Sequence, residues 1–431
     1  MTTPVRSIRP VAVLGGNRIP FARSNAQYLD ATNEQMLGAA LAGLIDRFGL
    51  ADEPIGEVAG GAVVKLARDH SLTREAVVGS KLARRTPALD IQQQCSTGGQ
   101  TVVHIANKIA LGQIDSGIAC GADTTSDPPI GFGPKLRNRL VRINAARSNA
   151  ARAREIARLR PTDFDLDIPG PAERRTGLPP GEGQALTGAA WGVTRAAQDE
   201  LALASHRNLA AAYDRGFFAD LMTPFRGLDH DGNLRRDVDE AKLARLRPCF
   251  GGPDGTMTAA NSTTLTDGAS TVLLATDAWA AERGIEPLAY LIDAQSAAVD
   301  YVDGDPRDEG VLMAPAYAVA TLLDRNGLTL ADFDLYEIHE AFASQVLSTL
   351  AAWGDPRFGR ERLGRAEPLG TVDRSKLNVN GGSLATGHPF GATGGRIFAG
   401  TAKALAERGG GRALISICAG SGMGVVAILQ R

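Results

Sequence analysis

The sequence contains few aromatic residues and few cysteines. Of its 431 residues, 5% are aromatic and four are cysteines, none of them in a C-x-x-C pair. No cluster of metal ligands is visible, and a cytoplasmic protein with reduced thiols is the simplest interpretation. The first ten residues, MTTPVRSIRP, lack the apolar core of a signal peptide. No apolar run approaches the ~18 residues of a membrane span.

An excess of charge of either sign is also absent. The 46 basic and 48 acidic residues nearly balance, so binding of nucleic acid is not favoured. The chain is too long for one simple core and indicates two or three domains. It has no Walker motif and no G-x-S-x-G. GSGMG resembles a nucleotide loop, but the chain ends at Arg431, before the helix and strand of a dinucleotide fold.

Glycine is abundant, with 50 residues, and indicates many tight turns. PVAVLGGNRIPF predicts a buried strand that ends in a glycine turn. Residues 33–50 and 100–112 have apolar side chains at helical spacing, and residues 115–123 predict a short strand of small residues. Towards the C-terminus, GHPFGATGG leads into a helix, which is followed by a predicted strand, tight turn and strand.

Both ends of the chain thus combine a glycine-rich turn, a helix that starts beside a reactive residue, and a strand of small residues. We interpret this as a duplicated α/β unit. The middle differs, because residues 128–190 are rich in Pro, Arg and Gly. We expect an N-terminal half, an inserted loop domain and a C-terminal half. Their predicted bounds are 1–127 (completed by about 256–276), 128–255 and 277–431.

Cys95 lies in QQQCSTGGQTV, just before a predicted helix. The N-terminus of a helix presents unpaired N–H groups and a partial positive charge. These features stabilise a thiolate, so we expect a pKa below the free value of ~8.5, and the same N–H groups can hold an oxyanion. Ser96, Thr97, Gly98 and Gly99 would keep the approach to the sulfur uncrowded. The alternative is a buried structural cysteine.

His388 and Cys418 are candidate partners of this thiol. His388 stands between glycines in GHPFGATGG and could take the proton of a nearby cysteine, although a lone histidine is more often structural. Cys418 ends an apolar run at a glycine turn, where a thiol can approach a substrate closely. We interpret Cys120 as a core residue and Cys249 as a structural one.

His339 lies in YEIHEAFASQ, where a histidine and a glutamate open a predicted helix. Taken by itself, the pattern favours a capped helix with a solvated histidine. His104 lies within a helix and is expected to be structural.

Cys95, HEAFA, GHPFGATGGR and CAGSGMG together resemble the thiolase family, in its order and spacing and over nearly the whole chain. LRPCF (246–250) and GTMTAANSTTLTDGA (255–269) match as well. The histidine of HEAFA, where many thiolases have asparagine, is similar to the branch of the trifunctional-enzyme β-subunit. The resemblance implies an α/β, five-layered αβαβα fold of two similar halves with an inserted loop domain.

The resemblance also implies an acyltransferase that cleaves 3-oxoacyl-CoA with CoA, or condenses acetyl-CoA with acyl-CoA. Cys95 would carry the acyl group, His388 would take its proton, and Cys418 would be the base at the α-carbon of acetyl-CoA. One oxyanion hole would use His388 and His339, and a second the backbone N–H groups of Cys95 and Gly420. No metal and no tightly bound cofactor is expected, with CoA and acyl-CoA as substrates.

Three further positions follow from the resemblance. Thr263 would bond the pantetheine arm, Arg235 would lie near the CoA nucleotide, and Phe342 would line the pocket. Two stretches depart from the family pattern. The pantetheine loop has Glu182–Gly183 in place of Met-Gly, and PGPAERRTGLPPGEG is unusual, so the acyl-chain preference is left open.

Two other functions compete with that of a thiolase. A related decarboxylating condensing enzyme would lack a second cysteine, so Cys418 argues against it. A catalytically silent CoA-binding subunit of a β-oxidation complex is disfavoured by the intact set of four residues.

Residues 135–160 carry nine basic residues and one acidic residue, Glu155. A solvated face of the loop domain is the default interpretation. A docking surface for a membrane or for a hydratase/dehydrogenase subunit comes next, and attraction of the CoA phosphates third. We expect a homodimer or homotetramer, and no nucleic acid as a partner.

Overall fold

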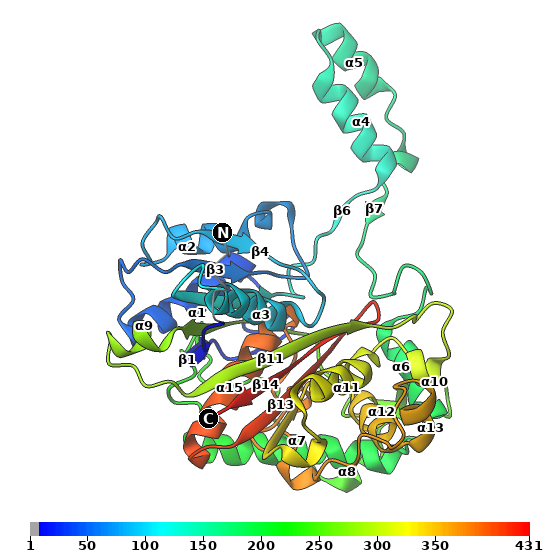
Figure 1. Ribbon diagram of the computed structural model, residues 1–431. Helices are drawn as coiled ribbons and strands as arrows, with labels where there is room; N and C mark the ends of the chain where they lie inside the picture. The colour runs from blue at the N-terminus through cyan, green and yellow to red at the C-terminus, as the bar shows by residue number, and fades with distance from the viewer. Residues whose placement is uncertain (1–7) are drawn as a thin grey trace, which may run out of the picture.

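The structure is a computed structural model that describes residues 8–431. Residues 1–7, which belong to the stretch without a signal-peptide core, lie outside the described residues. The core is a ten-stranded sheet made of two smaller sheets that meet at β1 and β11 (Figure 1). The first sheet contains β4 (Ala88–Asp90), β3 (Glu57–Gly60), β5 (Ser116–Asp123), β10 (Thr266–Ala275) and β1 (Ala12–Arg18), with β2 (Ala22–Arg23) paired to β10. The second contains β11 (Ala289–Ala298), β14 (Met423–Gln430), β13 (Arg412–Ala419) and β12 (Leu335–Ile338).

The two sheets have the same topology. In the first, β3 pairs parallel to β5, which pairs antiparallel to β10, which pairs antiparallel to β1. In the second, β12 pairs parallel to β13, which pairs antiparallel to β14, which pairs antiparallel to β11. The predicted duplication of an α/β unit is therefore confirmed. The boundaries proposed for the halves and the loop domain remain a prediction.

Helices cover both outer faces and fill the space between the sheets. The first outer layer packs α1 (Asn33–Phe48), α2 (Leu72–Gly79) and α9 (Asp277–Ala281) into one apolar cluster with the first sheet. The middle layer is α3 (Thr97–Ala110) and α15 (Phe390–Arg408), which share a cluster with both sheets. The third packs α11 (Ala314–Asn326) and α12 (Ala343–Gly354) on the second sheet. This order is the five-layered αβαβα arrangement that the sequence predicted.

Local sequence signals set the ends of α1. Thr32 caps its N-terminus and forms a capping box with Gln35, and Gly49 ends it in the left-handed conformation at φ 65°. The apolar residues that predicted this helix face the core, among them the fully buried Met36 and Leu44. Here the sequence pattern alone is enough to specify the element.

Glycines allow α3 and α15 to touch along their first turns. A Cβ added to Gly98 would lie 2.5 Å from the carbonyl oxygen of Gly391, and one added to Gly394 would fall on the backbone nitrogen of Gly99. Only residues without a side chain permit such an approach. We expected Gly98 and Gly99 to keep the sulfur of Cys95 accessible, but their main effect is to bring two helix N-termini together.

The glycine pair near the N-terminus does not end β1, contrary to our expectation. The strand continues through Gly15 and Gly16 to Arg18, with a bulge between Val13 and Gly15. A Cβ on Gly16 would lie 2.5 Å from Ala399 of α15. These glycines therefore serve the packing of the middle helical layer against the sheet.

An arm projects from the body between β5 and β9 (Met257–Thr258). Its stalk is the antiparallel pair β6 (Gly131–Phe132) and β7 (Leu166–Asp167), and its tip is the helix pair α4 (Pro134–Ala145) and α5 (Asn149–Ala157), far from the layers (Figure 1). Residues after the arm return to the second sheet as α6 (Pro180–Ala190), α7 (Arg195–Asp214), α8 (Glu240–Ala244) and β8 (Pro248–Phe250). The remaining short helices are α10 (Pro306–Glu309), α13 (Pro356–Glu361) and α14 (Ser383–Thr386).

Along residues 8–431 we find no helix with the length and apolar character that crossing a bilayer requires.

We predict that Gly394→Ala destabilises the protein by about 1–3 kcal/mol, the usual cost of overpacking, because the new methyl group forces α15 away from α3. The matched control is Gly400→Ala on the same helix, where an added Cβ meets nothing within 4 Å. Denaturant unfolding should show the control at or above wild-type stability. Equal stability of the two variants would contradict the proposed helix contact.

Candidate active site

Cys95 stands two residues before α3. Ser96 is the N-cap residue, and Gln94 adopts a left-handed conformation with φ 47° while its carbonyl accepts the Thr97 N–H at 3.0 Å. This tight turn presents the sulfur beside two backbone donors, the N–H groups of Cys95 itself and of Gly420. The turn therefore places a thiol and a pair of oxyanion donors at one point.

The expected acidification of Cys95 is wrong. Burial raises the pKa of the Cys95 thiol to about 12, although the N–H of Gly420 acts in the opposite direction. The charges of Asp123 and Glu173 raise this pKa further. Cys95 is half-buried, and the loss of water around its sulfur outweighs the effect of the helix N-terminus, so the resting thiol is protonated.

Cys418 lies at the end of β13, 1% exposed, in an apolar cluster with Val311, Leu312 and Ala341. Burial raises the pKa of the Cys418 thiol well above its usual range, and the charge of Cys95 raises it further. The N–H of Ala341 acts in the opposite direction. The effect of Cys95 on Cys418, together with the N–H of Gly420 that reaches the Cys95 sulfur from two residues beyond Cys418, places the two sulfurs in one site.

His388 precedes α15, with Pro389 as the N-cap residue. Its Nδ1 lies 2.6 Å from the hydroxyl of Thr393, which itself donates to the carbonyl of Pro389. Burial and the charge of Arg396 lower the pKa of His388 to about 3, so the imidazole is neutral near pH 7. Its Nε2 is buried with no hydrogen-bond partner in residues 8–431. The ring thus offers a free basic nitrogen.

His339 occupies the turn between β12 and α12, and its ring centroid is 4.1 Å from that of His388. The helix begins only at Ala343, and His339 is fully buried, so a solvated histidine at a helix start is wrong. Burial and the charges of His388 and Arg396 lower the pKa of His339 well below its usual range. Its Nε2, like that of His388, lacks a partner among the described residues.

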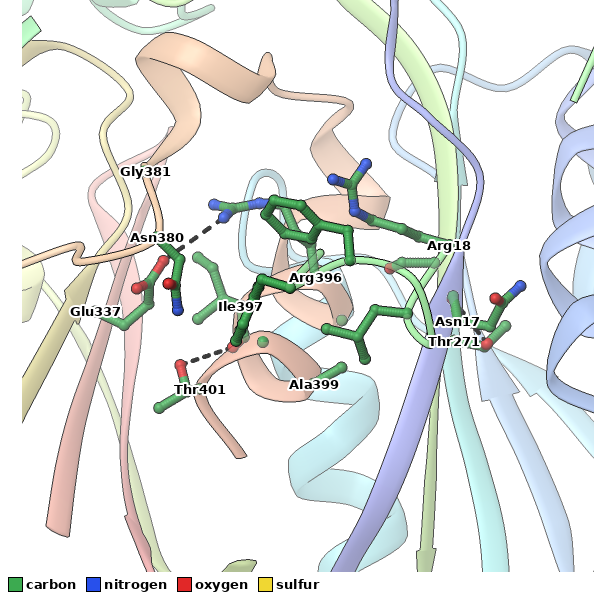
Figure 2. Close-up of a pocket in the computed structure, with 16 residues that line it drawn as sticks. Asn17, Arg18, Thr271, Glu337, Asn380, Gly381, Arg396, Ile397, Ala399 and Thr401 are labelled. Carbon is green, nitrogen blue, oxygen red and sulfur yellow. Dashed lines mark hydrogen bonds and ion pairs between the residues drawn. The ribbon is translucent and has the colours of Figure 1, made fainter. Parts of the chain in front are cut away.

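Ser383 and Arg396 determine which nitrogen of His339 carries the hydrogen. Arg396 donates to the Ser383 hydroxyl at 3.1 Å, and this hydroxyl lies 2.8 Å from Nδ1 of His339. The described residues give the hydroxyl hydrogen no other acceptor, so Nδ1 accepts and Nε2 carries the proton. Arg396 is held in turn by Glu337 at the wall of a small cavity (Figure 2). His339 therefore presents a donor at its free nitrogen.

Two buried carboxylates, neither of them singled out from the sequence, hold the turns of the site. Asp123 accepts the N–H of Gly391 at 2.6 Å and fixes the first turn of α15. Glu340 accepts from Asn378 at 2.6 Å and from the N–H of Leu384 at 3.0 Å. Burial raises the pKa of both carboxyl groups, that of Asp123 to about 7. The sequence signal that could have indicated them is their position, because Asp123 ends a predicted strand and Glu340 directly follows His339.

Family models match both parts of this arrangement, the thiolase N-terminal domain over residues 11–278 and the thiolase C-terminal domain over residues 285–431. The chain belongs to the thiolase family. The 3-ketoacyl-CoA thiolases of Yersinia pestis (strain Pestoides F) and Yersinia pseudotuberculosis serotype O:1b (strain IP 31758) are each 38% identical to it over 426 residues, 97% of this chain and 96% of the relative.

Solved structures agree with this assignment. Human mitochondrial 3-ketoacyl-CoA thiolase superimposes with a TM-score of 0.80 and 26% identity, covering 98% of this chain and 99% of that one. The Bacillus anthracis acetyl-CoA acetyltransferase gives the same values. As a thiolase, the chain is an acyltransferase, and its substrates are CoA and its thioesters.

The three residues expected to contact CoA have different surroundings in the structure. Phe342 packs beside Cys418, as a pocket residue would. The hydroxyl of Thr263 donates to the carbonyl of Ala341 at 2.9 Å, so it can only accept from a ligand while that bond holds. Arg235 is exposed, and its guanidinium makes no ion pair or hydrogen bond with residues 8–431.

Arg23 is a candidate that the sequence did not reveal. Burial and, to a smaller extent, the charge of Arg235 lower the pKa of Arg23. The Nε atom of Arg23 has no hydrogen-bond partner in the described chain. Arg23 pairs with Thr266 across β2 and β10, and the Thr266 hydroxyl accepts the N–H of His388 at 2.7 Å. Arg235 thus lies near Arg23, whose strand is linked through Thr266 to the turn of His388.

The other predicted residues lie outside this site. Cys120 is 1% exposed within β5, in agreement with a core role. Cys249 is exposed, with its sulfur 3.6 Å from the carbonyl of Met257. His104 lies on α3, 2.6 Å from Glu57. The cavity in Figure 2 is lined by neither catalytic cysteine candidate.

We predict that alkylation of Cys95 by iodoacetamide accelerates about tenfold per pH unit from pH 6 to 9, as expected for a thiol that titrates far above this range. The reason is the burial that raises the pKa of Cys95 to about 12. Mass spectrometry of the Cys95 peptide separates it from the exposed Cys249. A plateau with a midpoint below pH 7 would show a resting thiolate instead.

Proposed function

We propose that this thiolase acts through an acyl group carried on Cys95. The reaction is the CoA-dependent thiolytic cleavage of a 3-ketoacyl-CoA, which in reverse is a Claisen condensation with acetyl-CoA. The observation that carries the proposal is the contact between the starts of α3 and α15, which brings the turns of Cys95 and His388 together. The N–H of Gly420, two residues after Cys418, reaches the Cys95 sulfur, and the Nε2 atoms of His388 and of its neighbour His339 have no partner in residues 8–431.

In the first step, Cys95 attacks the 3-keto carbonyl and the C2–C3 bond of the substrate breaks. Because the thiol is protonated at rest, it needs a base, and the neutral His388 offers Nε2. The electron pair of the broken bond leaves on acetyl-CoA as an enolate, to which the thiol of Cys418 gives its proton. The thiol of CoA then gives its proton to the Cys418 thiolate and attacks the acyl-Cys95 thioester. The shortened acyl-CoA is released, and the Cys95 sulfur takes back its proton from His388.

An enolate and a tetrahedral oxyanion each need preplaced donors. We propose that His339, with its hydrogen on Nε2, donates to the enolate oxygen, and that His388 does so once it has taken the Cys95 proton. The N–H groups of Cys95 and Gly420, which already reach the sulfur, would hold the oxyanion of acyl transfer. Before the reaction, His339 is thus a hydrogen-bond donor at Nε2, and the neighbouring His388 is a proton acceptor at Nε2.

For CoA we propose an anchor at two arginines. The charge of Arg235 contributes to lowering the pKa of Arg23, and the phosphates of the nucleotide would neutralise both arginines. A structure of the human relative holds CoA. Thr263, beside the HEAFA turn, would accept a hydrogen bond from the pantetheine amide, and Phe342 would line its path.

The division of labour between the cysteines is tested by acylation with acetyl-CoA. We expect Cys95→Ala to carry no acetyl group, and Cys418→Ala to be acetylated on Cys95 while condensation and thiolysis fall by more than about 10³-fold, as for loss of a proton-transfer group that acts in every turnover. Intact-protein mass and a CoA-release assay report the two steps. Acetylation of the Cys95→Ala variant, or loss of acetylation in a folded Cys418→Ala variant, would contradict the assignment.

We also propose that the arm binds an anionic membrane surface. Eight of the eighteen large apolar side chains that are exposed in residues 8–431 lie between 130 and 168, in the segment that carries the basic run. Figure 1 shows this arm standing clear of the catalytic layers. Exposed apolar groups beside arginines suit the boundary of an anionic bilayer, whereas a solvated face would not need the apolar groups.

Three arginines of the helix pair α4 and α5 provide the test. The triple replacement of Arg142, Arg154 and Arg158 by Gln should abolish sedimentation with phosphatidylglycerol vesicles and leave thiolysis unchanged. A matched control replaces the exposed Arg84, Arg85 and Arg360, which lie away from the arm. Equal vesicle binding by both variants would contradict the proposal and leave a partner subunit as the occupant to examine.

Three further expectations complete the proposal. We infer a homodimer or homotetramer, because the first sheet ends at the short edge strand β4, a natural place for pairing with a second copy. A hydratase/dehydrogenase subunit is a candidate partner, and a cytoplasmic location suits the four free cysteines. We also propose an N-terminal half of residues 1–127 that is completed by about 256–276, an inserted loop domain of residues 128–255 and a C-terminal half of residues 277–431.

A further inference from the structure

A strained residue follows the proposed oxyanion donor. Ser421 lies in the turn between β13 and β14 with φ 61°, in the left-handed region that favours glycine. Its predecessor Gly420 directs an N–H to the sulfur of Cys95. The peptide plane between the two residues contains the Ser421 N–H, so a bond that holds this N–H fixes the C-terminal side of Gly420 and restricts the orientations open to the Gly420 N–H.

A carboxylate clamps this strained residue. Glu173 Oε1 accepts the N–H of Ser421 at 2.8 Å, and Oε2 accepts its hydroxyl at 3.0 Å. The carboxylate also covers Gly420, since a Cβ there would lie 2.9 Å from Oε1. Two charge-assisted bonds to one residue fix both its backbone and its side chain.

Glu173 is itself held in a closed turn. Its N–H donates to the carbonyl of Leu178 at 2.9 Å, and its carbonyl accepts the N–H of Gly177 at 2.8 Å. Gly177 supports this turn with φ 71°. This is the PGPAERRTGLPPGEG segment that departs from the family pattern, so its unusual sequence reaches the catalytic turn through one side chain.

We propose that Glu173 is a positioning residue that holds Ser421 in its strained conformation and so aims the Gly420 N–H at the acyl group on Cys95. The inference rests on the proposed function, in which Gly420 is an oxyanion donor. A serine at this position needs the clamp, whereas a glycine would adopt the same conformation unaided.

Four proteins test the clamp: wild type, Glu173→Ala, Ser421→Gly and the double variant. The measurement is the rate of Cys95 acetylation at saturating acetyl-CoA, by rapid quench and mass spectrometry. Glu173→Ala should be slower by about 10–100-fold, somewhat less than the loss of a whole oxyanion donor, with little change in KM. Ser421→Gly and the double variant should both remain near the wild-type rate, because glycine removes the strain.

Glu173→Gln is the conservative control and should keep most of the rate, since the amide can bond both the N–H and the hydroxyl of Ser421. A double variant as slow as Glu173→Ala would overturn the proposal, and so would a Glu173→Ala variant as fast as wild type. If wild type itself forms no acetyl-Cys95, the proposed function fails instead, so the two failures are distinguishable.

Discussion

The contact between the N-terminal turns of α3 and α15 is the constraint on which the site depends. Cys95 and His388 each stand just before one of these helices, and each helix belongs to a different half of the duplicated fold. Their approach requires glycine on both sides, at Gly98 and Gly394 in particular. The duplication thus creates a pair of equivalent helix starts, and the glycines let these starts meet, so that Cys95 and His388 can act together as we propose.

Burial gives the site its second property, which is a set of neutral groups. It raises the pKa values of Cys95 and Cys418 and lowers those of His388 and His339. In the reaction that we propose, each proton therefore has a defined starting place. The hydroxyls of Thr393 and Ser383 give the two imidazoles different roles, although both rings leave Nε2 free.

Much of the fold follows from local sequence, as α1 shows with its cap residues and apolar face. The local sequence also singled out Cys95 and His388 as candidates, because each stands beside a glycine-rich helix start, and their proposed roles remain a prediction. Long-range effects were not predictable in this way. The pKa of Cys95 depends on how other layers of the fold cover it. The function of Gly98 depends on a helix almost 300 residues away. The clamp by Glu173 depends on a contact between an insertion and the C-terminal turn.

The most direct test of the account is a crystal structure of the Cys418→Ala variant with an acetyl group on Cys95. The account predicts that the acetyl oxygen accepts hydrogen bonds from the N–H groups of Cys95 and Gly420, and that Nε2 of both His388 and His339 faces the space next to the acetyl carbon. An acetyl oxygen bonded elsewhere, or an imidazole of His388 turned away from the sulfur, would contradict it.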